Sequence, residues 1–277
     1  MSTAPSMAAA HPASIAPATT LQDLKIAAAW GVLSGLAAAA LIPYVAQLMP
    51  EVFAKVPVPL AVVAAAQGAQ AMVVVGLLAW LGLRMGHRVG LGSPLMHAWL
   101  VRRQRPDWAR LRPVQAALLG IAAAVAILAL APLVDRALPP MLHPPATAGS
   151  GTTAFNGFLA SFYGGIVEEL MLRLFLMTLL LWLAARLRGR TPPAWAYWCA
   201  IVAAALLFGA GHLPAAAQVW GLEPVVVLRT LLLNGIAGVA FGWLYWKRGI
   251  EMAMLAHFSA DLVLHVAAPL LAPGSMP

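Results

Sequence analysis

Three charged residues, Glu168, Glu169 and Arg173, lie in a stretch from Phe155 to Leu183 that carries no other charge and is mostly apolar. A charged side chain at the centre of a bilayer costs about 3 to more than 10 kcal/mol. Such residues are therefore rare in membrane segments, face the protein interior and usually mark a site. This stretch is a candidate for chemistry inside a membrane.

The spacing of the three charges separates their roles. Glu169 and Arg173 are four residues apart, so on a helix they share a face and can pair. Glu168 is turned by about 100° from Glu169 and is left available. A carboxylate in apolar surroundings is suited to act as a general base toward water. We therefore predict that Glu168 is catalytic and that Glu169 and Arg173 support it.

Histidines supply the other candidate groups. His212 follows Phe208 by one helical turn, and His257 precedes Asp261 by one turn in a later apolar stretch. A His–Asp pair on one helix face within a membrane span is hard to explain by packing alone. We predict that His212, His257 and Asp261 complete the site, and that His265 is a weaker candidate on the same helix.

The composition places these residues in a membrane protein. Of the 277 residues, 62% are hydrophobic and 9% are charged, which is unlike a soluble domain. We expect an all-α polytopic protein of about seven transmembrane helices with a polar catalytic cavity. Residues 1–24 are expected to form a disordered tail, and residues 25–277 a single transmembrane domain with 155–265 as its catalytic core.

Apolar stretches long enough to cross about 30 Å of hydrocarbon predict the spans. They lie near residues 26–49, 58–83, 113–135, 156–185, 194–213, 225–246 and 250–272. Counted from the basic loops, Glu168 and His212 would lie more than about 25 Å deep and His257 only about 13 Å deep. A tilted or broken helix, or a misplaced boundary, would have to bring them together.

Lys and Arg are concentrated in segments 84–112, 186–190 and 247–248, which fall on one side of this arrangement. The positive-inside rule then predicts a cytoplasmic N-terminus, and we expect an integral protein of a bacterial cytoplasmic membrane. The net charge of +8 is a signal of topology, and no nucleic-acid partner is expected. Segment 84–112 fits either a short helix on the inner membrane surface or a solvated basic loop.

Three short motifs occur on separate apolar stretches in the order Glu168-Glu169-x-x-x-Arg173, Phe208-x-x-x-His212 and His257-x-x-x-Asp261. Together they resemble the motifs of the CPBP intramembrane proteases, the family of CAAX proteases and bacteriocin-processing enzymes. The resemblance covers about residues 155–265. It implies an endopeptidase in which Glu168 activates water, His212 assists, and His257 with Asp261 stabilises the oxyanion. The implied partners are the lipid bilayer and a membrane-associated peptide or protein substrate.

Two departures from the family pattern bear on these roles. Asp261 stands where the family often has Asn, and an ionised Asp cannot donate a hydrogen bond to an oxyanion. Asp261 would have to be protonated, or would instead orient His257. Leu172 and Leu174 stand where the family commonly has Phe and Gly, which leaves the charged positions untouched.

Other mechanisms and functions compete with this interpretation. Glu and His side chains can ligate zinc, but no H-E-x-x-H motif is present. We expect a metal-independent mechanism without a cofactor, with a zinc protease as the alternative. The candidate nucleophiles Ser161, Ser259 and Cys199 have no evident base as a set. A proton- or ion-coupled transporter using Arg229 and Asn234, or an inactive scaffold, are the alternatives from other classes.

Overall fold

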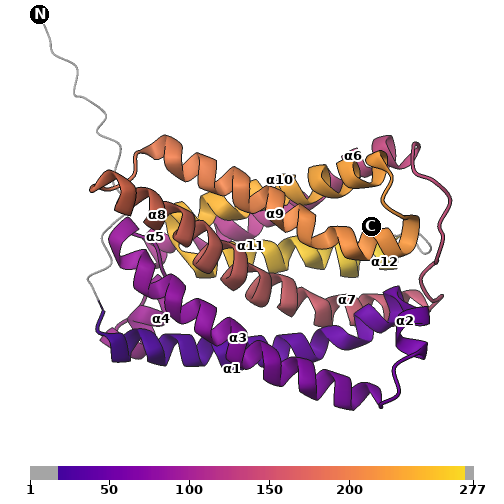
Figure 1. Ribbon diagram of the computed structural model, residues 1–277, viewed down its shortest axis with the longest axis horizontal. Helices are drawn as coiled ribbons and strands as arrows, with labels where there is room; N and C mark the ends of the chain where they lie inside the picture. Colours follow the sequence, from indigo (N-terminus) through magenta and orange to yellow (C-terminus); the bar gives the residue numbers. More distant parts are fainter. Residues whose placement is uncertain (1–17, 272–277) are drawn as a thin grey trace, which may run out of the picture.

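The computed structural model describes residues 18–271 of the chain, and every regular element in this range is helical. Seven helical segments are long and apolar enough to cross a membrane. Figure 1 shows them running along the long axis of the molecule, with α1 beside α3 on one side and α9 and α10 on the other. The protein is therefore all-α and polytopic, as predicted.

The seven spans are α1 (Thr20–Leu48), α3 (Leu60–Val89), α5 with α6 (Trp108–Leu111 and Pro113–Asp135), α7 to α8 (Ser150–Arg188), α9 (Ala194–Trp220), α10 (Pro224–Arg248) and α11 to α12 (Ile250–Leu271). Short elements join them: α2 (Pro50–Ala54), α4 (Pro94–Met96) and the π-helical turn η1 (His97–Arg102).

Several predicted boundaries are wrong, including the end of the second span, which lies at Val89 rather than at residue 83. The expected tail of residues 1–24 overlaps α1, which begins at Thr20 because Thr19 and Gln22 form a capping box, with bonds of 2.8 and 3.3 Å. Residues 1–17 lie outside the described part of the chain. The fifth span does not end at residue 213 but continues through Pro214 to Trp220, so His212 lies well within α9. Pro214 removes one helical hydrogen bond without breaking the helix.

The helices approach each other closely at small residues, as is typical of membrane interfaces. A side chain on Gly31 of α1 would meet the backbone of Met72 on α3, and one on Gly35 would meet the backbone of Gly68. Gly120 of α6 likewise lies against the backbone of Ala256, just before His257 on α11. The last of these contacts fixes the position of a helix that carries site residues.

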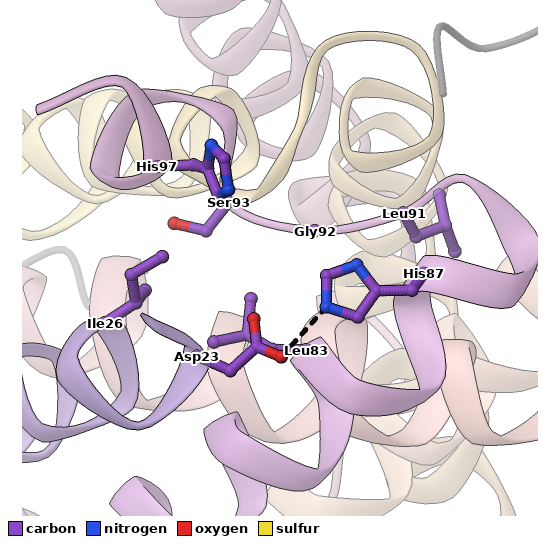
Figure 2. A pocket seen from close by; sticks show the side chains of 8 residues that line it. All are labelled: Asp23, Ile26, Leu83, His87, Leu91, Gly92, Ser93 and His97. Carbon is purple, nitrogen blue, oxygen red and sulfur yellow. Dashed lines mark hydrogen bonds and ion pairs between the residues drawn. The ribbon is translucent and has the colours of Figure 1, made fainter. Parts of the chain in front are cut away.

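One end of the helix bundle, which we call the basic end, contains the start of α1 and the end of α3. Asp23 of α1 accepts a hydrogen bond from Arg84 of α3 at 3.0 Å and contacts His87 Nε2 at 2.9 Å. Figure 2 shows the contact between Asp23 and His87, with Ser93 and His97 on the far side of the pocket that these residues line. The volume of this pocket is about 10 Å³. These contacts hold the first two spans together where the basic segments gather.

The segment between α3 and α5 folds over the turn that joins α10 to α11. The Ile250 amide donates to the carbonyl of Gly92 at 3.1 Å. The buried Glu251 carboxylate accepts from the Ser93 hydroxyl at 2.6 Å and from two amides of α4 at 3.0 Å. The segment is thus not a free loop, and it contains a short helical stretch, α4 with η1 over Pro94–Arg102, as one of the two interpretations predicted. Because it covers the turn, α11 begins beneath it.

We predict that Gly120→Ala destabilises the protein by roughly 1–3 kcal/mol, the usual cost of overpacking. The added methyl group would enter the backbone of Ala256, which is fully buried and cannot move aside easily. The thermal unfolding midpoint of the detergent-purified protein measures this. Gly235→Ala on α10 is the matched control, since nothing lies within 4 Å of its added methyl group. Equal midpoints for the two variants would contradict the packing argument.

Candidate functional site

The span from Ser150 to Arg188 changes its helical winding where it carries the site. It contains two π-helical segments, η2 (Tyr163–Glu168) and η3 (Leu170–Met177), on either side of Glu169. The Thr178 hydroxyl donates to the Arg173 carbonyl, five residues back, at 3.3 Å. π-Helical turns are rare and often occur at functional sites. Hydrophobic periodicity alone did not predict them.

Glu169 is the most enclosed acidic group of the site. Arg173 Nη1 donates to its Oε1 at 2.7 Å, and both side chains are fully buried. Arg173 also donates from Nη2 to the carbonyl of Gly238 on α10 at 3.2 Å. Its guanidinium lies 4.9 Å from the ring centre of Phe208 and 5.5 Å from that of Phe241. The predicted Glu169–Arg173 pair is therefore present. Through Arg173 it also connects this span to α10.

His257 is oriented by Glu169 rather than by its neighbour on α11. Its Nδ1 lies 2.8 Å from Glu169 Oε1, the same oxygen that binds Arg173. Its ring stacks on Phe241 with centroids 4.6 Å apart. Because a carboxylate only accepts hydrogen bonds, Nδ1 carries a hydrogen and Nε2 points to the other side. This link between the first and third motifs was not predicted.

Glu168 differs from Glu169 in accessibility. Its side chain is 21% exposed, whereas that of Glu169 is 0% exposed. Glu168 Oε1 lies 3.9 Å from His212 Nε2, and Oε2 lies 3.7 Å from His257 Nε2. Both separations are too long for direct hydrogen bonds but suit groups that share a bridging water. Three helices thus bring one accessible carboxylate and two histidines together.

Phe208 explains why an aromatic residue precedes His212 by one turn. Its carbonyl lies 2.9 Å from His212 Nδ1 and accepts a hydrogen from it. Its ring makes edge contacts with His212 at 4.8 Å and with His257 at 5.5 Å between centroids. The same ring lies beside Arg173. Phe208 therefore contacts both histidines and Arg173.

Asp261 lies at the edge of the cluster. Its Oδ1 is 3.7 Å from His257 Nε2 and 3.9 Å from His265 Nε2. His265 Nδ1 in turn lies 3.1 Å from the Tyr44 hydroxyl on α1. A side chain at Gly164 would collide with Asp261 and would reach within 3.0 Å of His257 Nε2. Glycine at this position leaves the space that these polar groups occupy.

Several other candidates have structural partners. Arg229 pairs with Asp135 at 2.6 Å, and the Asn234 amide donates to the carbonyl one turn earlier. Ser161 and Ser259 donate to carbonyls of their own helices. Over residues 18–271, no group of three or more His, Cys, Asp or Glu side chains is placed to hold a metal ion.

The fold and the site define a polytopic membrane protein that encloses a cluster of ionisable side chains between its helices. Residues 150–263 match the family described as type II CAAX prenyl endopeptidase, Rce1-like. This match over residues 150–263 is consistent with the predicted CPBP resemblance. No curated protein and no solved structure matches the chain.

The match covers all three motifs and supports an intramembrane protease of the CAAX type. It also indicates membrane-associated substrates within a lipid bilayer. The transporter alternative is not favoured, and Arg229 and Asn234, which it would have used, are bound to structural partners.

We predict that Arg173→Met lowers the yield of folded protein by removing the charge that balances buried Glu169. Leaving one partner of a buried ion pair alone costs about 3–5 kcal/mol. The double variant Glu169→Gln/Arg173→Met should recover much of the yield, because no unpaired charge remains. Monodisperse yield in size-exclusion chromatography and the unfolding midpoint measure both. A double variant less stable than Arg173→Met alone would contradict this account.

Proposed function

We propose that this protein is an intramembrane endopeptidase in which Glu168 activates water to hydrolyse a peptide bond of a membrane-associated substrate. The observation that carries the proposal is the difference between adjacent carboxylates. Glu169 is buried and bound to Arg173 and His257, whereas Glu168 is partly exposed and lies within 4 Å of two histidine nitrogens. Of these two carboxylates, only Glu168 is free to exchange a proton with water.

In the proposed reaction, Glu168 removes a proton from water while the water oxygen attacks the carbonyl carbon of the scissile bond. The tetrahedral oxyanion then collapses, the C–N bond breaks, and protonated Glu168 returns its proton to the leaving amine. His212 is placed to hold the water, because its Nδ1 hydrogen is used by the Phe208 carbonyl and its Nε2 faces Glu168. No covalent intermediate with the protein is required.

His257 and Asp261 are proposed as the oxyanion donors. With Nδ1–H directed at Glu169, His257 donates from Nε2 when its ring is protonated, and the Glu169 carboxylate stabilises that cation. Asp261 is 3.7 Å from His257, too far to orient the ring by a direct hydrogen bond. Since Glu169 performs the orienting role, we favour a protonated Asp261 that donates to the oxyanion.

A zinc protease, the alternative mechanism, would need Glu168, His212 and His257 as ligands, although the structure does not place these three side chains to hold a metal ion. Dialysis of the active enzyme against a chelator, with metal analysis of the protein before and after, distinguishes the two. Under the metal-independent proposal, activity persists in protein that contains much less than one metal ion per chain. Activity that falls with metal content and returns on adding zinc would overturn it.

The substrate class follows from the family and the membrane setting. A prenylated peptide with a C-terminal CAAX sequence is the first substrate to test, and other membrane-associated peptides are the second. The basic end of the helix bundle is proposed to be cytoplasmic, in a bacterial cytoplasmic membrane.

We predict that Glu168→Gln reduces hydrolysis in proteoliposomes by at least about 10²-fold, the lower range for loss of a general base. Folding should be retained, because the side chain is partly exposed and forms no direct hydrogen bond within residues 18–271. Cleavage of a fluorogenic lipidated peptide measures the activity, and the unfolding midpoint checks the fold. Asn234→Ala, which removes a polar group of the same helix bundle outside the site, is the activity control. Undiminished cleavage by Glu168→Gln would refute the proposed base.

We also predict that Asp261→Asn retains most of the activity and holds it to higher pH. The donor role requires a protonated carboxyl, which is lost as pH rises, whereas an amide donates at every pH. The pH–rate profiles of both proteins measure this difference. A large loss at all pH values would mean that the ionised carboxylate is required, and the donor role would be wrong.

A further inference from the structure

A second polar cavity, none of whose lining residues belongs to the catalytic motifs, lies at the basic end between segment 90–111 and the end of α10. Its volume is about 250 Å³. Five of its lining residues are cationic and one is acidic: Arg102, Arg105, Arg110, Lys247 and Arg248, with Asp107. The Asp107 carboxylate caps α5 by accepting from the Arg110 amide at 3.1 Å. Nothing in the proposed proteolytic mechanism uses this cavity.

The cations of this cavity outnumber its acidic groups five to one. None of the five forms an ion pair with any residue from 18 to 271. No Asp or Glu occurs in residues 1–17 or 272–277. Asp107 lines the cavity, and the other eight of the nine acidic residues of the chain do not. The cavity therefore has a net positive charge that an anion from outside the chain can neutralise.

Buried hydrogen-bond donors point to the same conclusion. Trp246 and His97 are only 8% and 7% exposed, and both line the cavity. Trp246 Nε1, His97 Nε2 and Arg248 Nε are buried and have no hydrogen-bond partner in the described part of the chain. The Trp and Arg nitrogens only donate, so each lacks an acceptor. Burial, followed by the charge of Arg102, lowers the pKa of His97, so its ring is neutral at pH 7 in the absence of an anion.

The place of the cavity decides which anion is available. α10 ends at Arg248, and the neighbouring segment exposes Trp99, which is 50% exposed, and Trp108. Tryptophan is enriched where a membrane meets water, so the cavity lies at the level of the lipid headgroups. Phosphate groups are the abundant anions at this level, and basic pockets between transmembrane helices bind anionic headgroups.

We propose that this cavity binds the phosphate headgroup of an anionic glycerophospholipid. The arginines bind the phosphate oxygens in the paired geometry that guanidinium groups favour, and the buried Trp246 indole supplies a further donor. A bound lipid would hold segment 90–111 against the α10–α11 turn, where Ile250 bonds to Gly92. That turn leads directly into the helix that carries His257. The proposal does not depend on the protein being a protease.

The test uses the full chain in neutral detergent, with phosphatidylglycerol as the anionic lipid and phosphatidylcholine as the zwitterionic one. Native mass spectrometry measures which lipid is retained, and the unfolding midpoint measures stabilisation. Arg105→Gln/Arg110→Gln should weaken phosphatidylglycerol binding about 30-fold, the effect of losing two interfacial cations. Arg186→Gln/Arg188→Gln, at the same end but outside the cavity, should bind within about twofold of the native protein.

Equal retention of the two lipids by the native protein, or an equal loss in both double variants, would overturn the proposal. Inorganic phosphate that displaces the lipid completely would assign the cavity to soluble phosphate, and a peptide with a free carboxyl group that does so would assign it to a peptide end. Either result would overturn it as well. The native-protein lipid comparison needs no variant, so a folding failure of the double variant leaves the proposal testable.

Discussion

The site depends on a single buried oxygen, Oε1 of Glu169. It accepts hydrogen bonds from Arg173 on the same helix and from His257 on α11, while Arg173 extends the contact to α10. A charge in this setting is tolerated only when it is paired and hydrogen-bonded. Because one oxygen meets both demands, the positions of three helices are coupled to each other. Displacing α10 or α11 would remove a hydrogen bond from this buried charged pair.

This coupling gives the adjacent carboxylate its freedom. Glu169 is paired with Arg173 and orients His257. Glu168 forms neither of these contacts and is partly exposed. The aromatic rings of Phe208 and Phe241 enclose Arg173 and His257 from the other sides. They exclude water from the paired charges, and electrostatic interactions are stronger where water is excluded. Two carboxylates next to each other in sequence thus serve different purposes because their surroundings differ.

The sequence predicted the helical class, the number of spans and the pairing of Glu169 with Arg173, since each follows from local composition or from i,i+4 spacing. It did not predict the bond between Glu169 and His257, because the two residues are 88 positions apart. The π-helical segments were also missed, since their winding leaves no mark on an apolar pattern. Counting residues from the basic loops placed Glu168 and His257 at different depths, whereas their side chains lie 3.7 Å apart in the structure. The resemblance to a protease family located the motifs but not these contacts.

Charged residues are paired inside the helix bundle but are in cationic excess at the basic end. Inside the helix bundle, where an unpaired ion is most costly, three of the nine acidic residues gather around Arg173 and two histidines. At the basic end, the buried Asp23 is bound to Arg84 and His87, and the buried Glu251 accepts hydrogen bonds from Ser93 and two amides of α4, so neither offsets the exposed arginines. Water and headgroups screen exposed cations there, so a surplus of arginine is tolerated. The chain thus balances its charges within the bilayer and leaves the cations of its basic end to their surroundings.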